Sequence, residues 1–131
     1  MKLLDTNICV YAIRNRPAGI RERLDAEGLS AVALSIITAM ELEVGAWRSG
    51  GTDYARRVRR FLAQIEVLAL DDGSREIYGE LRLSLEKRGS MIGPLDALIA
   101  AHALALDATL VTNNQREFKR VKGLRLENWV D

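Results

Sequence analysis

Short apolar runs alternate with helical patterns along this chain, and that alternation most narrows the folds open to it. Strand-like runs lie at residues 2–4, 31–35, 66–70 and 108–112, with a further edge strand at 124–126. Apolar residues at helical spacing fill the segments 8–15, 20–27, 38–49, 53–65, 71–89, 94–107 and 115–121. Because parallel strands need a crossover between them, this order predicts a three-layer α/β/α sandwich around a mostly parallel sheet.

Length and charge set the broad class of protein. The chain has 131 residues, of which 48% are hydrophobic and 28% charged, so residues 1–131 are expected to form a single globular domain. Lys and Arg number 19 against 18 Asp and Glu, so no overall basic field indicates nucleic acid, and any RNA contact must be local. The N-terminus lacks a signal-peptide pattern, and no run reaches the ~20 apolar residues of a membrane span. These absences predict a soluble, cytoplasmic protein.

Two residue types that often carry chemistry occur only once. Cys9 is the only cysteine, which excludes an internal disulfide and fits a reducing compartment; its place in an apolar helix predicts packing. His102 is the only histidine, and on an Ala-rich helix it is expected to pack or face solvent rather than act as a base. The chain also has no Ser or Cys triad and no glycine-rich phosphate loop.

Four other polar side chains stand where strands end or helices begin. They are Asp5, Glu41, Asp96 and Asn114. The carboxyl ends of parallel strands meet at one edge of a sheet, where ligands bind in open α/β folds. Carboxylates about 4 Å apart would repel by roughly 4 kcal/mol at an effective dielectric near 20, and a divalent cation would remove that repulsion. The pattern therefore suggests a metal-dependent phosphodiesterase.

Each of these residues also has a purely structural interpretation. Asp5 or Asn114 could cap a helix, as could Thr6 or Asn7, and Glu41 and Asp96 could be first-turn acids favoured by the helix dipole. In particular, Thr38 and Glu41 have the spacing of a capping box. Because all four are expected on one edge of the sheet, a shared metal or catalytic site is favoured over four separate structural roles.

The motifs around these residues resemble a known family. They are Leu3-Leu4-Asp5-Thr6-Asn7, Met40-Glu41-Leu42 with Gly45, the segment 93–100 around Asp96, and Leu110-Val111-Thr112-Asn113-Asn114 with Glu117-Phe118. In this order, from Asp5 to Trp129, they resemble PIN-domain ribonucleases, and more closely the VapC toxins of toxin–antitoxin pairs. Any one motif alone would be weak evidence for the family, but four motifs in this order over the full length make the resemblance specific.

The resemblance implies a fold, an activity and a set of partners. It implies a PIN-like sheet with helices on both sides and an Mg²⁺- or Mn²⁺-dependent endoribonuclease that cleaves structured RNA, with tRNA as one candidate. It further implies homodimers and hetero-oligomers in which a cognate antitoxin neutralises the toxin. We expect the helical hairpin around residues 49–51 and the long helix near 77–85 to supply dimer and antitoxin contacts, and the antitoxin to insert a basic side chain toward the acids.

The resemblance also assigns roles to residues. Asp5, Glu41 and Asp96 are the implied catalytic acids and metal ligands, with Glu41 either a ligand or the base for a bound water. The family often has Asp at the position of Asn114, so direct metal binding there is an open question, and Glu117 one turn on is a substitute. Thr6 and Thr112 are expected to hydrogen-bond the carboxylates or to cap helices.

Three other classes of protein fit the sequence less well, and one cluster of basic residues has two interpretations. A receiver-like phosphoacceptor module needs an Asp where Ser35 stands and a Lys after a later strand, and an aspartate-nucleophile phosphatase needs an acid where Asn7 stands. A catalytically silent PIN scaffold would not retain the three acids, and a small antitoxin gene directly upstream would favour the toxin. The arginines at 56, 57, 59 and 60 are expected to form a solvated helix face, with RNA contact as the alternative.

Overall fold

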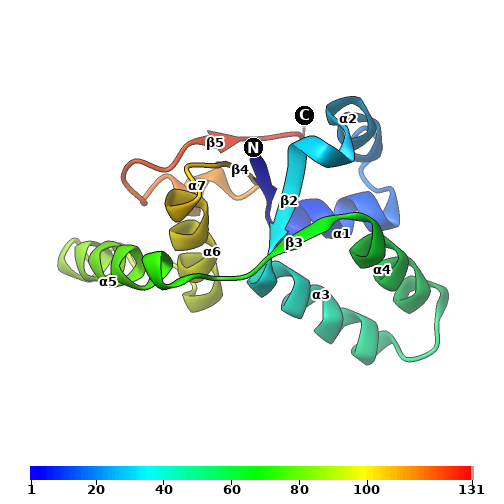
Figure 1. The fold of residues 1–131 in the computed structure, drawn as a ribbon, viewed down its shortest axis with the longest axis horizontal. Helices are drawn as coiled ribbons and strands as arrows, with labels where there is room; N and C mark the ends of the chain where they lie inside the picture. Colours follow the sequence, from blue (N-terminus) through cyan, green and yellow to red (C-terminus); the bar gives the residue numbers. More distant parts are fainter. Residues whose placement is uncertain (131) are drawn as a thin grey trace.

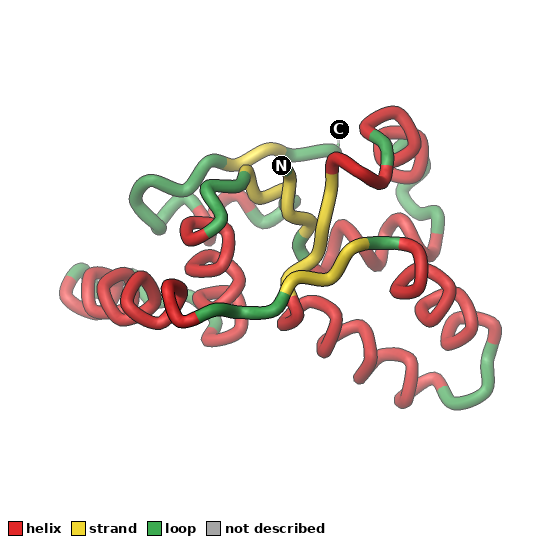
Figure 2. The backbone as a smooth tube through the Cα atoms, in the orientation of Figure 1, coloured by secondary structure: helices red, strands yellow, loops and turns green. Residues whose placement is uncertain are grey.

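The computed structural model of the protein describes residues 1–130 and has a five-stranded sheet at its centre (Figures 1 and 2). The strands are β1 (Lys2–Leu4), β2 (Val32–Ser35), β3 (Glu66–Leu68), β4 (Thr109–Val111) and β5 (Leu126–Glu127). Their order is β3-β2-β1-β4-β5, and each neighbouring pair is parallel. The mostly parallel sheet expected from the sequence is confirmed, and among the described strands it is parallel throughout.

Helices cover both faces of this sheet. The helices are α1 (Thr6–Arg14), α2 (Ile20–Glu27), α3 (Ile36–Ser49), α4 (Asp53–Gln64), α5 (Asp72–Lys87), α6 (Pro94–Ala105) and α7 (Gln115–Phe118). Leu4 and Leu34 pack with α1 to α4, whereas Leu3 and Ala33 pack with α5 to α7. Because successive residues of a strand point to opposite faces, these two apolar cores lie on opposite sides of the sheet. The α/β/α sandwich is therefore confirmed.

Several helix starts differ from the sequence expectation. Of the residues that the sequence offered as caps of the first helix, Asp5 is the N-cap of α1, and its carboxylate accepts from the Ile8 N–H at 2.9 Å. Helix α3 begins at Ile36 with Ser35 as its N-cap, so the capping box of Thr38 with Glu41 is wrong. Ser35 ends a buried strand and its hydroxyl can cap at once, which lets the helix begin two residues early.

Strand and helix ends also differ by a few residues. β3 stops at Leu68 rather than residue 70, α6 ends at Ala105, α7 is only Gln115–Phe118, and β5 is Leu126–Glu127. Apolar pattern marks which residues can be buried, but strand ends are set by where a partner strand stops.

The two singly occurring residues behave as expected. Cys9 is fully buried in the core, where burial raises the pKa of its thiol. His102 is buried on α6, with Nδ1 2.8 Å from the Ser35 Oγ, and burial lowers its pKa. No helix among residues 1–130 is long and apolar enough to cross a membrane.

Candidate active site

A cavity of about 220 Å³ lies beyond the carboxyl end of β1. It is lined by Asp5, Thr6, Asn7, Glu41, Asp96, Asn114 and Phe118. The structure thus brings together all four polar residues that the sequence placed at strand ends and helix starts. Asn7, which is exposed at the first turn of α1, also lines the cavity, although the sequence interpretation gave it only a capping role. Its place two residues after Asp5 was the available signal.

Asp5 is the most buried acid of the cavity. It follows β1 directly, and its Oδ1 caps α1 while its Oδ2 accepts from the Thr112 hydroxyl at 2.5 Å. Thr112 follows β4, which is the neighbour of β1, so strand pairing brings together two residues 107 positions apart. Burial raises the pKa of Asp5, and the charge of Glu41 adds to this, whereas the bonds from Thr112 and Ile8 act in the opposite direction. The carboxylate is fixed in orientation at both oxygens.

Glu41 reaches the cavity from the second turn of α3. Its Oε1 accepts from the Thr6 hydroxyl at 2.5 Å, and the Thr38 hydroxyl lies 3.4 Å from the same Thr6 oxygen. Thr38 is fully buried one turn before Glu41, so it supports this contact rather than capping the helix. The first turn of α1 therefore orients Glu41 in the way that Thr112 orients Asp5.

Asp96 enters from the first turn of α6, which Pro94 opens. Asp96 is half-buried and lies against Glu117 of α7, with which it shares a hydrogen bond. Burial, followed by the charges of Glu117, Glu41 and Asp5, raises the pKa of Asp96 to about 7. Glu117 is itself held by the Gly93 N–H, which donates to its Oε1 at 2.7 Å.

Asn114 directs its amide at Glu117. Its Nδ2 donates to Glu117 Oε2, and its backbone N–H donates to the Thr112 hydroxyl at 2.9 Å. It stands at the N-cap position of α7, but its side chain makes no cap bond there. Thr112, Asn114 and Glu117 thus form a connected group along one side of the cavity.

The donor set suits a hard divalent cation. Within residues 1–130, no three His, Cys, Asp or Glu side chains converge into a complete metal-binding group. Mg²⁺, however, keeps several waters and needs only one or two carboxylates from the protein. The cavity gathers half-buried and buried acids; burial first, and then the charges of neighbouring acids, raise the pKa values of Asp5 and Asp96, and no basic side chain lines the cavity. A cation would relieve that repulsion, so the residues present fit one.

Comparison with known proteins places the whole chain in one family. The model of the PIN domain matches residues 2–124. The tRNA(fMet)-specific endonuclease VapC of Shigella flexneri is 41% identical over 128 residues, which cover 97% of this chain and 96% of that protein. Ribonuclease VapC2 of Rickettsia felis is 43% identical over 129 residues, with the same coverage of both chains.

Solved structures agree in fold. VapBC2 from Rickettsia felis, bound to a DNA fragment from its promoter, has a TM-score of 0.89 at 41% identity and covers 98% of both chains. DNA-bound VapBC from Salmonella typhimurium has a TM-score of 0.87 at 39% identity, again over 98% of both chains. The family match, the full-length relatives and the shared fold agree, and the chain belongs to the PIN-domain family and, within it, to the VapC ribonucleases.

Proposed function

We propose that this protein is the endoribonuclease toxin of a toxin–antitoxin pair and that its substrate is a structured RNA of the tRNA class. The observation that carries the proposal is that Asp5, Glu41 and Asp96 meet at one cavity of a fold shared end to end with VapC ribonucleases. The tRNA class follows from the Shigella flexneri relative, whose name specifies tRNA(fMet). Such a substrate places the protein in the cytoplasm.

Asp5, Glu41 and Asp96 are the acids that would hold Mg²⁺ or Mn²⁺. A bound ion would activate water and neutralise charge developing on the phosphodiester. Thr112 and the Ile8 N–H keep both oxygens of Asp5 in a fixed orientation, and Thr6 does the same for one oxygen of Glu41. Burial and the charges of Glu117, Glu41 and Asp5 raise the pKa of Asp96 to about 7, and a bound cation would favour its ionised form.

Asn114 has a supporting role in this proposal. Because its Nδ2 is engaged with Glu117, its Oδ1 is the atom through which it would contact a cation or one of the waters around it. The contact would be neutral, so the site carries one negative charge less than a site with Asp at that position.

A cognate antitoxin is the second partner. Besides the VapBC complexes, a toxin–antitoxin complex from Klebsiella pneumoniae shares the fold, with a TM-score of 0.75 at 27% identity. A basic side chain of the antitoxin, directed at the acidic cavity, would pair with carboxylates that otherwise attract a cation.

We also propose a homodimer formed through α3. Met40, Val44 and Trp47 lie one turn apart and are 59%, 53% and 75% exposed. On α5, by contrast, Leu81 and Leu85 are buried in the core and Leu83 is the exposed residue. The stripe on α3 is therefore the larger apolar surface. Trp47→Lys should convert a dimer to a monomer in sedimentation, and a wild-type protein that is already monomeric would overturn this part.

Cleavage of tRNA tests the activity directly. Purified protein should cut initiator tRNA in Mg²⁺ and lose cleavage in chelator. Asp5→Asn and Asp96→Asn should each lower the cleavage rate by more than about a hundredfold, because both remove charge from the cavity where negative ligands are needed. Both variants should keep the wild-type circular dichroism spectrum. Undiminished cleavage by both folded variants would reject the assignment of the site.

A further inference from the structure

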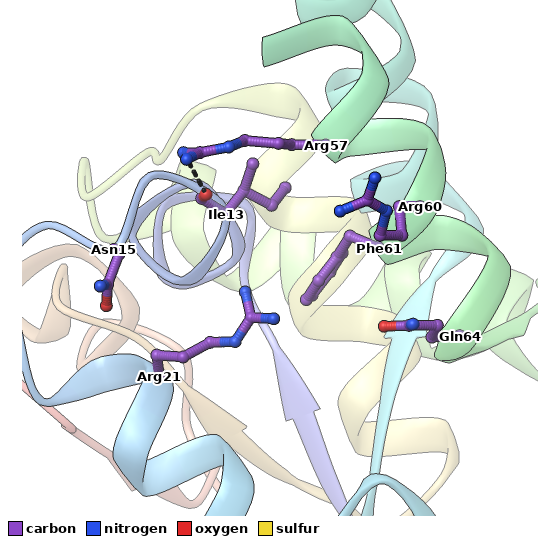
Figure 3. Close-up of a pocket in the computed structure, with 7 residues that line it drawn as sticks. All are labelled: Ile13, Asn15, Arg21, Arg57, Arg60, Phe61 and Gln64. Carbon is purple, nitrogen blue, oxygen red and sulfur yellow. Dashed lines mark hydrogen bonds between the residues drawn. The ribbon is translucent and has the colours of Figure 1, made fainter. Parts of the chain in front are cut away.

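A second cavity, of about 330 Å³, lies at the other end of α1 and is lined by arginines. Arg21 comes from α2, and Arg57 and Arg60 come from α4, together with Phe61 and Gln64. Figure 3 shows Arg21, Arg60 and Gln64 reaching toward the space beside the Phe61 ring. No acidic residue is among those that line this cavity in the described chain. We call it the arginine pocket.

Two of the three guanidinium groups are already held in place. Arg21 Nη1 donates to the Ala12 carbonyl at 3.2 Å, and Arg57 Nη1 donates to the Ile13 carbonyl at 3.3 Å (Figure 3 draws the second bond). Both carbonyls belong to the last turn of α1, where the helix dipole favours cations. A guanidinium has five N–H donors, so each retains donors for a ligand. This arrangement lowers the ordering cost of binding an anion.

Arg60 differs from the other arginines of α4. Arg57 pairs with Asp53 at 3.0 Å, and Arg59 pairs with Glu43 at 2.8 Å. Arg56 donates to the Gly51 carbonyl at 3.2 Å. Arg60 is exposed and makes no hydrogen bond or ion pair with any other residue in 1–130. Its charge is therefore the one in the cluster 56–60 left for an external anion.

We infer that the arginine pocket binds a phosphate group of the RNA substrate at a distance from the cleavage site. A phosphate offers several acceptor oxygens and suits more than one guanidinium at once. The inference rests on the proposed ribonuclease function, because it takes the same RNA to reach both cavities. It gives a local basic contact to a chain whose net charge is only +1.

The position of the pocket along α1 supports an RNA that spans both cavities. Asp5 caps the start of α1 and lines the acidic cavity, whereas Asn15 caps its end and lines the arginine pocket. Nine helical residues span about 14 Å at 1.5 Å each, so the two cavities are separated by roughly that length along α1. This separation is small compared with a folded RNA, so one substrate molecule is large enough to contact both cavities.

The first test compares Arg60→Gln with Arg75→Gln. Arg75 lies on α5, is 80% exposed and pairs with Asp72, so its variant removes the same charge elsewhere. Arg60→Gln should raise the KM for initiator tRNA about three- to tenfold and leave kcat within about twofold, because a remote contact contributes to binding alone. Arg75→Gln should change neither. Equal KM values in the two variants would overturn the phosphate site.

The second test measures binding apart from cleavage. Each substitution is made in the Asp5→Asn protein, and the Kd for labelled initiator tRNA is measured from 50 to 300 mM KCl at fixed Mg²⁺. The slope of log Kd against log salt should fall by about 0.7 to 0.9 with Arg60→Gln and stay unchanged with Arg75→Gln. A wild-type protein that fails to cleave tRNA rejects the proposed substrate, whereas cleavage with unchanged salt slopes rejects only the pocket. If Arg60→Gln weakens only co-purification with the co-expressed antitoxin, the pocket binds an acidic peptide and the phosphate assignment is wrong.

Discussion

The acidic cavity and the arginine pocket lie at opposite ends of α1 and are built in different ways. In the acidic cavity, Asp5 and Glu41 accept hydrogen bonds of 2.5 Å from Thr112 and Thr6, and each bond joins elements far apart in the sequence. The arginine pocket uses exposed side chains of two surface helices: main-chain carbonyls of α1 accept from Arg21 and Arg57, and Asp53 pairs with Arg57. Reaction chemistry needs acids fixed in place, whereas phosphate binding can use long cationic side chains at the surface.

This contrast predicts different kinetic signatures. Changes at the acidic cavity should lower kcat, and changes at the arginine pocket should raise KM.

The largest expected effect comes from the hydroxyl that orients Asp5. Thr112→Val keeps the shape of a fully buried side chain but removes the donor to Asp5 Oδ2. We expect kcat to fall about 10- to 100-fold, as for other groups that orient metal ligands, with KM nearly unchanged. Thr109→Val, at the start of β4, is the control and should retain activity. A Thr112→Val protein with normal kcat would show that Asp5 needs no such partner.

The next effect is on stability against pH. The pKa of Asp96 is raised to about 7 in the folded protein from an ordinary value of 3.8. A carboxyl with a raised folded pKa contributes stability that is present below pH 3.8 and is lost as the pH rises through about 7. Without divalent metal, the melting temperature of the wild-type protein should therefore fall more between pH 5.5 and pH 8 than the melting temperature of Asp96→Asn.

Mg²⁺ and a surface acid provide the controls for that measurement. Mg²⁺ should stabilise the wild-type protein more at pH 8 than at pH 5.5, because the carboxylates that bind it are then ionised. Asp25→Asn changes an exposed acid on α2 and should leave the pH dependence of the wild type in place. Because His102 is present in every variant, its own titration cancels in the comparison. Identical pH profiles for Asp96→Asn and wild type would contradict the raised pKa.

The smallest effect is expected at Asn114. Asn114→Asp adds a charge that attracts the cation, but it also replaces a donor to Glu117 with a second carboxylate. We expect a lower Mg²⁺ concentration for half-maximal cleavage, and a metal-free protein less stable by roughly 1 kcal/mol. Asn114→Ala should reduce activity less than loss of Asp5 or Asp96. No shift, or a shift to higher Mg²⁺, would mean that the metal site is built without this side chain.

The local sequence pattern predicted most residues of the site but not the hydrogen bonds between them. The sequence indicated which acids stand at strand ends because apolar runs and helix starts are local features, and these acids do line one cavity. It misjudged Thr38 and Glu41, whose capping-box spacing is real in the sequence but falls one turn inside α3. Spacing alone does not show where a helix begins when the preceding strand residue, Ser35, can cap it.

The arginines of α4 show the same limit. Four arginines within residues 56–60 look alike in the sequence and fit a solvated face. In the structure, three are engaged by Gly51, Asp53 or Glu43, and Arg60 lines the pocket beside Phe61 without such a partner among residues 1–130. The choice among them depends on where α1, α2 and α3 pack against α4, which no local pattern records.

The sequence by itself determined the alternation of strands and helices, the parallel sandwich and the acidic residue types at its carboxyl edge, because periodicity and capping depend on neighbours in the chain. Tertiary structure alone decided that Thr112 holds Asp5, that Thr6 holds Glu41 and that Asn114 faces Glu117. The first two contacts join residues 107 and 35 positions apart, and they depend on strand order and register. The third depends on how α7 turns away from the end of β4, and that turn is fixed when α7 packs into the core through Phe118.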